Sequence, residues 1–462
     1  MERSNDIYTI GRLQAFSDAV SAIVATILIL PLQKVDRSNS SDFEAYLRGH
    51  YSLLIIYFIA FLVICSVWEA HIMRWMVICR VDDILVCLNI ISLLFVSFLP
   101  FAVRLISKYT YHKTPFVLVC GIMLVLEVIE LLMIWYSFTR HELLRARLRN
   151  AYPFEIELKK NYIMKRKILN PVLFILAGAL SFVNVKISWV LILLVIITPC
   201  INRLLDMIIY RSTLDPEEQR VLIYEYIISK ERVECFTDGV YSIVATFLVL
   251  DISSDHFPSK EDVAAHGVEK TLSTMKSEFL TYVGTFGLCG LLWFVHHSLF
   301  HNLEKMSYPM VIMNNISLSC VGTLPFLVTI LNSYAEDENK CDRYAIQFCC
   351  LIIAVAGFSQ FVIFTLGLCN SSRYIDYHVI PCGPQNINHN YLLIKLLIIP
   401  TVATVIFCAS FASKFDSYIT YHVLVFVTPL IFIFVKFLYV KLVNNRRETM
   451  TIIRNEALWN NR

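Results

Sequence analysis

Residues 12–31 read RLQAFSDAVSAIVATILILP, and residues 232–251 read RVECFTDGVYSIVATFLVLD. At a constant offset of 220 the two stretches share an Arg, a Phe, an Asp and a Val, followed by the run IVAT. Each is an apolar helix of about 20 residues, which is the length that crosses the hydrocarbon core of a bilayer. The chain is therefore predicted to contain one membrane unit twice.

Both copies place a carboxylate near the start of the helix, at Asp18 and Asp238. An ionisable group is expensive inside a membrane, and on insertion scales a centrally placed Asp costs about 3 kcal/mol. Such residues face protein or water and usually have a partner. We therefore expect both carboxylates to be paired and to have a role.

The composition indicates the class of protein. The 462 residues are 57% hydrophobic and only 17% charged, and the mean hydropathy is +0.62, which is typical of a polytopic membrane protein. A net charge of +3 without interleaved basic and aromatic residues argues against nucleic acid as a partner. The 14 Cys show no CxxC pair, so buried hydrophobic roles are expected. The expected partners are the lipid bilayer and small solutes.

Apolar segments of spanning length recur six times in each half of the chain. They lie near 13–32, 51–73, 84–106, 115–138, 167–184 and 187–209, then near 233–252, 279–300, 309–331, 344–368, 391–412 and 417–443. Beyond the first helix, Trp68 and His71 match Trp293 and His296, and Asn89 matches Asn314, all at an offset of 225. The expected fold is an all-α polytopic membrane protein whose twelve transmembrane helices form two parallel six-helix repeats. The expected divisions are 1–210 for the first repeat, 211–231 for a cytosolic linker, 232–445 for the second repeat and 446–462 for a cytosolic tail.

Charge sets the expected orientation. Six helices return the chain to the side it started from, and the connection 140–167 is rich in Lys and Arg, so the positive-inside rule predicts cytosolic termini. The sequon at Asn39 then faces the lumen or the outside, where glycosylation occurs.

In this orientation the polar residues of the first three helices lie at one level. Trp68 and His71 are three residues apart and share a helix face, close to Asp18 and Asn89. We predict a buried hydrogen-bonded cluster that holds the first helix, repeated in the second unit by Asp238, Trp293, His296 and Asn314. Two readings stay open, a scaffold only and a scaffold that also takes part in gating, because polar contacts between membrane helices are ordinary.

Another face of the first helix carries an apolar stripe. At 100° per residue, Ile23 lies about 140° from Asp18, whereas Ile23, Thr26 and Leu30 fall within about 60° of one another. The second copy repeats the stripe as Ile243, Thr246 and Leu250. Taken alone, such a stripe is more often lipid contact or core packing.

Together, the paired RxxxFSD-type signatures, the IVAT runs, the repeated LPF of the third helix and the two six-helix units resemble the endolysosomal potassium channel family of transmembrane protein 175. The resemblance covers essentially the whole membrane part. It implies a homodimer in which the first helix of each repeat lines the pore, so that four first helices surround it. The function expected is a potassium-permeable cation channel of endosomal and lysosomal membranes, with protons as a second candidate ion and no cofactor.

Residue by residue, the resemblance makes Ile23 and Ile243 the pore constriction. Further lining is expected from Thr26, Leu30, Ser242, Thr246 and Leu250, and the signature network from Arg12, Phe16, Ser17, Asp18, Arg232, Phe236, Thr237 and Asp238. The second copy departs from the signature by reading FTD, which keeps the hydroxyl. The residue before the constriction is Ala22 in one copy and Ser242 in the other, so only the second repeat supplies a polar group there.

Two other classes of function remain as alternatives. A secondary transporter of a small cation or solute can also be built from parallel repeats, although no Pro interrupts the interior of either first helix and no charge lies on the apolar stripe. A membrane metalloenzyme could begin from His297 and His301, one helical turn apart, yet the first repeat has no counterpart. We therefore predict no metal site and no enzyme activity. Turnover faster than a carrier can cycle, or bound metal, would separate these classes.

Overall fold

The computed structural model describes residues 8–33, 43–110, 112–213, 229–254, 257, 259–335, 343–379, 386–411 and 414–460. Among these residues, ten helices are long and apolar enough to cross a membrane. The prediction of an all-α polytopic membrane protein is confirmed. The sequon at Asn39 lies outside the described residues.

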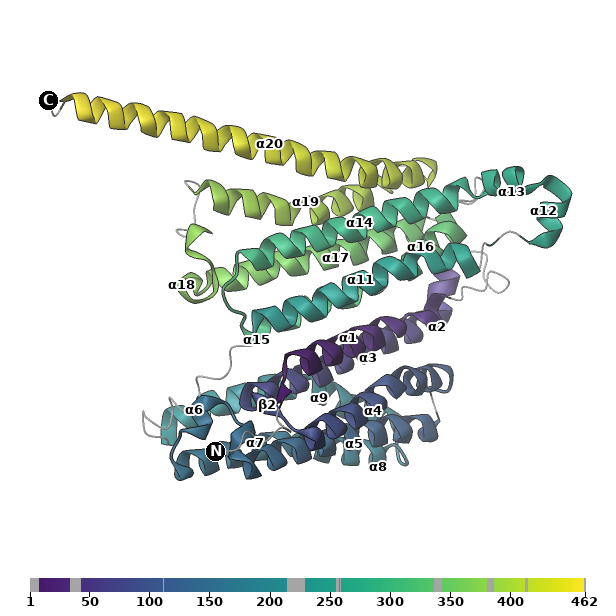
Figure 1. The fold of residues 1–462 in the computed structure, drawn as a ribbon. Coiled ribbons are helices and arrows are strands. Elements are labelled where there is room, and N and C mark those ends of the chain that lie inside the picture. Colours follow the sequence, from purple (N-terminus) through teal and green to yellow (C-terminus); the bar gives the residue numbers. More distant parts are fainter. Residues whose placement is uncertain are drawn as a thin grey trace. The chain divides into compact units, whose positions relative to one another are not determined.

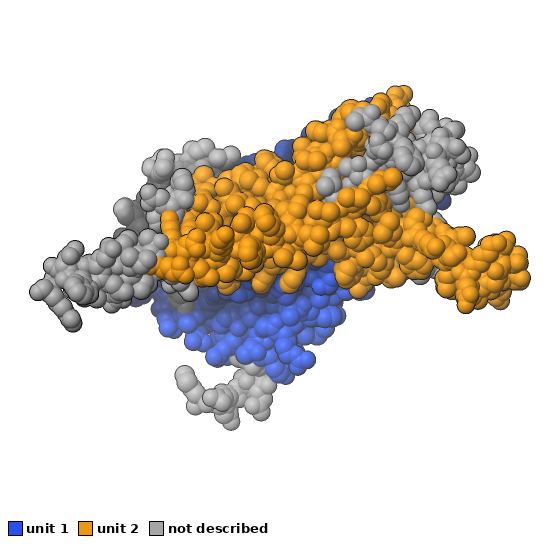
Figure 2. All heavy atoms as spheres, turned by 90° about the horizontal axis from the view of Figure 1, so that it is seen from above, with its two compact units in different colours: residues 1–34, 49–243 blue, residues 35–48, 244–462 orange. Residues whose placement is uncertain are grey.

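The chain divides into two compact units, which Figure 2 colours separately. Unit 1 consists of Met1–Lys34 and Gly49–Ile243, and unit 2 consists of Val35–Arg48 and Val244–Arg462. The division therefore falls inside the first helix of the second repeat. The division at 210 and 232 expected from the repeats stays a prediction, and most of the expected linker, residues 214–228, lies outside the described part of the chain.

Unit 1 is a bundle in which helices that follow one another in the chain pack side by side. α4 packs on α5, α5 on α8 and α8 on α9, while α1 packs on α4 (Figure 1). Its elements are β1 (Tyr8–Thr9), α1 (Gly11–Ile27), α2 (Leu30–Gln33), α3 (Phe43–Val77) from Gly49 onward, β2 (Arg80–Val81), α4 (Asp83–Lys108), α5 (Lys113–Thr139), η2 (His141–Leu143), α6 (Ala146–Arg149), α7 (Pro153–Lys167), α8 (Leu169–Leu180), α9 (Val185–Thr213) and the first half of α11 (Lys230–Ser254).

Two local contacts fix the positions at which α1 and α4 begin. β1 and β2 form an antiparallel pair, with Tyr8 opposite Val81, which holds the start of α1 beside the α3–α4 connection. Asp82 caps α4, because its carboxylate accepts a hydrogen bond of 3.0 Å from the Leu85 amide. The other carboxylate oxygen accepts a hydrogen bond of 3.2 Å from Arg140, which raises the pKa of that guanidinium. The connections at this end of unit 1 are therefore tied together.

The fifth predicted segment, 167–184, corresponds to α8, which has only 12 residues. At 1.5 Å per residue it is about 18 Å long, whereas the hydrocarbon core is about 30 Å thick. α8 follows α7 with only Ile168 between them, and α7 is too polar to complete a span. The described residues therefore do not confirm twelve spans.

Unit 2 repeats this order of neighbours. α15 packs on α17, α17 on α19 and α19 on α20 (Figure 1). Its elements are the second half of α11, α12 (Lys260–His266), α13 (Val268–Thr274), α14 (Lys276–His301), α15 (Tyr308–Val321), α16 (Leu324–Ile330), the π-helical turn η3 (Leu331–Ala335), α17 (Arg343–Leu368), α18 (Ser371–Tyr374), η4 (Tyr377–Val379), α19 (Ile387–Ala409) and α20 (Lys414–Asn460).

The two units treat the repeated LPF differently. α4 runs through Pro100 as one helix, whereas in unit 2 the helix breaks at Gly322 and Thr323, before Pro325. In the core of unit 2, a Cβ on Gly357 would lie 2.9 Å from Pro400 Cδ, so only Gly permits α17 to approach α19 this closely.

Candidate functional site

Asp18 joins three helices of unit 1. Its side chain is 1% exposed and accepts hydrogen bonds of 2.9 Å from Trp68 Nε1 on α3 and 2.6 Å from Arg232 Nη2 on α11. One turn after Arg232, Phe236 stacks on the Trp68 indole with ring centroids 4.1 Å apart. The carboxylate at the start of α1 is therefore held both by its own repeat and by the first helix of the second repeat.

A second group of contacts continues from this anchor into the bundle. Asn89 donates a hydrogen bond of 3.1 Å to Ser17 Oγ and accepts one of 3.0 Å from Arg74 Nη2. Arg74 pairs with Glu130 of α5 at 2.5 Å and lies 2.8 Å from Nε2 of His71. His71, expected in the same cluster as Asp18, thus contacts Arg74, which itself donates to the Asn89 amide oxygen.

Sequence reasoning did not single out Arg74 and Glu130. Both are buried, so the site holds two guanidinium groups, of Arg74 and Arg232, against the two carboxyl groups of Asp18 and Glu130. The sequence did contain a signal for them, because burying an Arg or a Glu inside an apolar span costs free energy, and such residues are therefore usually paired. Arg74 also lies three residues after His71, on the same face of α3.

The second copy is built differently. Phe236, Thr237, His296 and Asn314 are buried, whereas Asp238 is exposed and Trp293 is 39% exposed. The expectation that Asp238 is buried like Asp18 is therefore wrong for the single chain. The physical reason is that Asp18 is covered by the first helix of the second repeat, and one chain contains no further first helix to cover Asp238.

The charged pair of unit 1 is also missing from the equivalent positions of unit 2. Leu299 follows Arg74 by 225 positions, and Gln360 follows Glu130 by 230, which is also the offset between the first residues of α5 and α17. Gln360 is buried and donates a hydrogen bond of 3.3 Å to the Leu292 carbonyl. The same place in the bundle is thus occupied once by an ion pair and once by neutral side chains.

The residues expected to line a pore differ in how far their side chains are exposed. Ile23 is 42% exposed and Ile243 half-buried, while Ser242, Thr246 and Leu250 are exposed and Leu30 is half-buried. Thr26 is buried, and its hydroxyl donates to the carbonyls of Ala22 and Ile23 at 3.0 and 2.9 Å. The hydroxyl of Ser242 donates to the Asp238 carbonyl at 2.6 Å. A pore-lining role for these residues stays a prediction.

α1 and α11 approach closely beside Ile23. A Cβ added to Gly239 would lie 3.0 Å from the Cβ of Ala22, which is tighter than an ordinary van der Waals contact. The absence of a side chain at Gly239 therefore lets the two first helices come together at this level. The remaining signature residues, Arg12 and Phe16, are exposed on α1.

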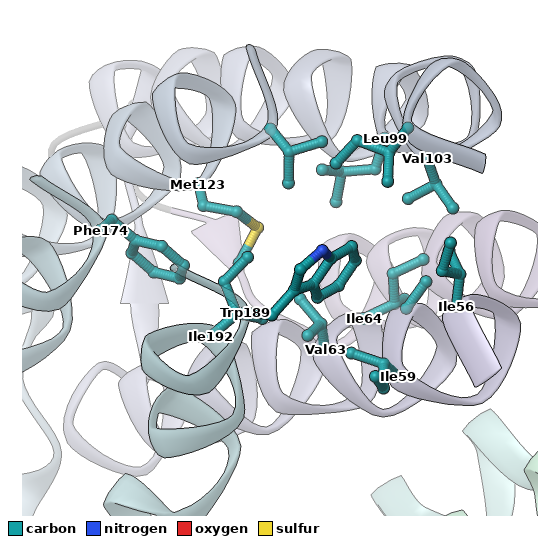
Figure 3. A pocket seen from close by; sticks show the side chains of 13 residues that line it. Ile56, Ile59, Val63, Ile64, Leu99, Val103, Met123, Phe174, Trp189 and Ile192 are labelled. Carbon is teal, nitrogen blue, oxygen red and sulfur yellow. The ribbon is translucent and has the colours of Figure 1, made fainter. Parts of the chain in front are cut away.

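An apolar cavity of about 40 Å³ lies elsewhere in unit 1, among α3, α4, α5, α8 and α9. The side chains of Trp189, Met123 and Val63 are among those that line it (Figure 3). No lining side chain offers a carboxylate, hydroxyl or amide oxygen, so the cavity cannot replace the water ligands of a cation. This cavity therefore offers a permeating ion no ligands.

Filling this cavity is expected to stabilise the protein slightly. Val63→Leu introduces the residue found 225 positions later, where Leu288 lines a smaller cavity of about 10 Å³ in unit 2. The gain should stay below about 1 kcal/mol, because in lipid only dispersion contacts favour packing. Thermal unfolding in detergent measures it, with exposed Val128→Leu as the control. A lower melting temperature for Val63→Leu than for the control would contradict this account of the cavity.

Metal binding finds no support in the described residues. They contain no group of three or more His, Cys, Asp or Glu side chains that could hold an ion. His297 instead stacks on the Trp293 indole with ring centroids 5.4 Å apart.

The family described as "Endosomal/lysosomal potassium channel TMEM175" matches residues 12–100 and 232–325. A zebrafish (Danio rerio) protein named "Endosomal/lysosomal proton channel TMEM175" is 30% identical, over 92% of this chain and 83% of its own length. The chain belongs to the TMEM175 family. The chicken (Gallus gallus) protein of the same name is also 30% identical, over 94% of this chain and 88% of its own. The resemblance inferred from the sequence is confirmed, and the family is one of channels rather than enzymes.

Among solved structures, one described as a "lysosomal potassium-selective channel TMEM175 homolog" from Chamaesiphon minutus is 21% identical. The match covers 44% of this chain and 96% of that chain, with a TM-score of 0.36. The two stretches that match the TMEM175 family contain most of the site, including Asp18, Trp68 and Arg232. Glu130 lies beyond the first matched stretch, on α5.

Proposed function

We propose that this chain is a cation channel of endosomal and lysosomal membranes that conducts potassium and protons. The proposal rests on the curated relatives, which are named endosomal/lysosomal proton channels, and on bacterial relatives named potassium channels. The observation that carries it is the anchoring of α1 and α11 to each other through Asp18 and Arg232, because these are the two helices that carry the Ile residues of the gate. The finer fold in this proposal is two six-helix repeats with the termini in the cytosol and Asn39 glycosylated in the lumen.

The gate in this proposal is the pair Ile23 and Ile243. Both side chains are branched and apolar, and Ile23 is 42% exposed on a helix whose opposite side is held by Asp18. A ring of such side chains offers a cation no oxygen ligands, so closure follows from dewetting. Potassium is favoured over sodium because the larger ion loses its hydration water at lower free-energy cost.

A homodimer completes the arrangement. Within one chain, Arg232 and Phe236 of the second repeat cover Asp18 and Trp68 of the first. The repeat-related set consists of Arg12 and Phe16, which are exposed, and of Asp238 and Trp293, which are also exposed in whole or in part. In a dimer, Arg12 of each copy would pair with Asp238 of the other. These two contacts between chains, together with the Asp18–Arg232 contact within each chain, would give four equivalent junctions around a central pore.

The homodimer proposal predicts a charge-swap result. Arg12→Asp or Asp238→Arg alone should weaken dimerisation by about 2 kcal/mol or more, which is about thirtyfold, because one partner of an interfacial charge pair is replaced by a like charge. The double variant should recover dimerisation. Native mass measurement in detergent gives the monomer and dimer populations.

The matched control uses the intrachain pair. Asp18→Arg with Arg232→Asp exchanges the same charges inside one chain and should leave the dimer population unchanged. If Arg12→Asp and Asp238→Arg each left the dimer intact, the two residues would not meet across the interface. A monomer that conducts would overturn the homodimer itself.

The channel function is tested by reconstitution. Purified protein in planar bilayers with a potassium gradient should give unitary currents, whose turnover exceeds what an alternating-access carrier reaches. Proton permeability is read from the shift in reversal potential when a pH gradient is imposed. Transport without resolvable unitary currents, at carrier rates, would favour the secondary transporter, the alternative that parallel repeats leave open.

A further inference from the structure

α7 carries a polar, basic sequence that the channel function does not require. Its residues read PFEIELKKNYIMKRK and connect the end of α5 to α8 within unit 1 (Figure 1). On one face, Ile156, Ile163 and Met164 pack against an apolar cluster formed by Val77, Ile134, Phe138, Leu144 and Leu148. The helix is therefore docked on the end of the bundle.

The docking site of α7 is tied to the end of α3. The backbone N–H of Arg145 donates to the Val77 carbonyl at 3.0 Å, and its guanidinium donates to the Trp75 carbonyl at 3.1 Å. The Cys79 amide donates to the Leu143 carbonyl at 2.9 Å. Because α3 and α5 are spanning helices that end at Val77 and Thr139, these contacts place α7 at the boundary between hydrocarbon and water.

The opposite face of α7 combines aromatic and basic groups. Phe154, Leu158 and Tyr162 recur every four residues and so share one face, and Phe154 is 65% exposed. Arg166 continues this row and donates a hydrogen bond of 2.6 Å to the Tyr162 hydroxyl. Lys165 is exposed beside them. Aromatic rings with Lys and Arg on one helix are typical of a helix that lies in the membrane interface.

The charge of this segment is unbalanced and is particular to unit 1. Residues 140–167 contain nine Lys and Arg against three Glu, whereas the equivalent connection in unit 2, residues 369–386, contains one Arg and one Asp. Some of the cations are already engaged, since Arg140 pairs with Asp82 and Arg145 bonds the α3 backbone. Lys160 and Lys165 form no ion pair with any residue that the structure describes. An excess of positive charge therefore remains at the boundary.

We propose that the outer face of α7 is a binding surface for the anionic headgroups of phospholipids in the adjoining leaflet, with Lys165 and Arg166 facing the phosphates and Phe154 inserted at the acyl boundary. Several cations on one short helix suit a multiply charged headgroup such as a phosphorylated inositol lipid, because each cation near an anionic surface strengthens binding about fivefold. Positive-inside orientation makes this the cytosolic leaflet.

The proposal is tested on the purified full chain in neutral detergent, by thermal unfolding with increasing short-chain phosphatidylinositol phosphate. The lipid should raise the melting temperature, and short-chain phosphatidylcholine should not. Lys165→Gln with Arg166→Gln should weaken the apparent affinity by about 25-fold, at about fivefold for each cation. The control Lys305→Gln with Arg373→Gln removes two exposed cations from unit 2 and should keep the parental affinity.

Two results would overturn the proposal. An unchanged affinity in the α7 double variant would place the lipid elsewhere, and an equal shift with free inositol phosphate or inorganic phosphate would make the site one for a soluble anion. If the double variant failed to unfold cooperatively, the single exposed change Lys165→Gln and the aromatic change Phe154→Ala keep the test available, each with an expected loss of affinity. None of these readings depends on ion conduction, so failure of the channel proposal would not affect them.

Discussion

Glu130→Gln is expected to destabilise the folded protein by about 3–5 kcal/mol, because it leaves the buried guanidinium of Arg74 without its carboxylate. Arg74 would retain contacts with His71 and the Asn89 carbonyl oxygen, which do not carry a compensating charge. Thermal or denaturant unfolding in detergent measures the loss. An unfolding free energy equal to that of the parent would show that the pair is solvated or already neutral.

The chain itself supplies the matched rescue. Arg74→Leu with Glu130→Gln installs the residue types that unit 2 carries at Leu299 and Gln360. Replacing both members of a buried pair removes the uncompensated charge, so most of the stability should return. The reverse change in unit 2, Gln360→Glu, should destabilise by burying a carboxyl group opposite no guanidinium. If the double variant were less stable than Glu130→Gln, Arg74 would have a further role that charge pairing does not explain.

Ile23→Asn with Ile243→Asn is expected to raise the basal current severalfold and to weaken the preference for potassium over sodium. Amide groups would wet a constriction that closes by excluding water, and they would offer ligands to both cations. Macroscopic currents under bi-ionic conditions measure both effects. Parental currents with an unchanged reversal potential would remove Ile23 and Ile243 from the permeation path.

The control for this experiment must lie on the lipid-facing side of α5. Val125 is unsuitable, because it is partly buried against the cluster around Trp75 and Met133. Val128, one turn away on α5, is 43% exposed. Val128→Asn should therefore leave the current and the ion preference unchanged.

Much of the architecture can be predicted from local pattern. Runs of about 20 apolar residues indicate spans whatever their neighbours are, and the match between Arg12–Pro31 and Arg232–Asp251 reveals the repeat and the family. The pairing of Asp18 with Trp68 was also accessible, because a costly charge at a known depth has few candidate partners. These inferences depend on length, periodicity and the free energy of burying charge.

The sequence by itself determined the class of protein, its repeats and which first-helix residues carry the signature. Only the tertiary structure decided that Arg232 reaches Asp18 within one chain while Asp238 is left exposed, and that Arg74 pairs with Glu130 on a different helix. It also decided that α8 is too short to span and that α7 docks on the bundle. The reason is that helical periodicity specifies which face a side chain occupies, whereas the helix that this face meets depends on how the helices pack. Two repeats with the same signature can therefore be completed by different neighbours.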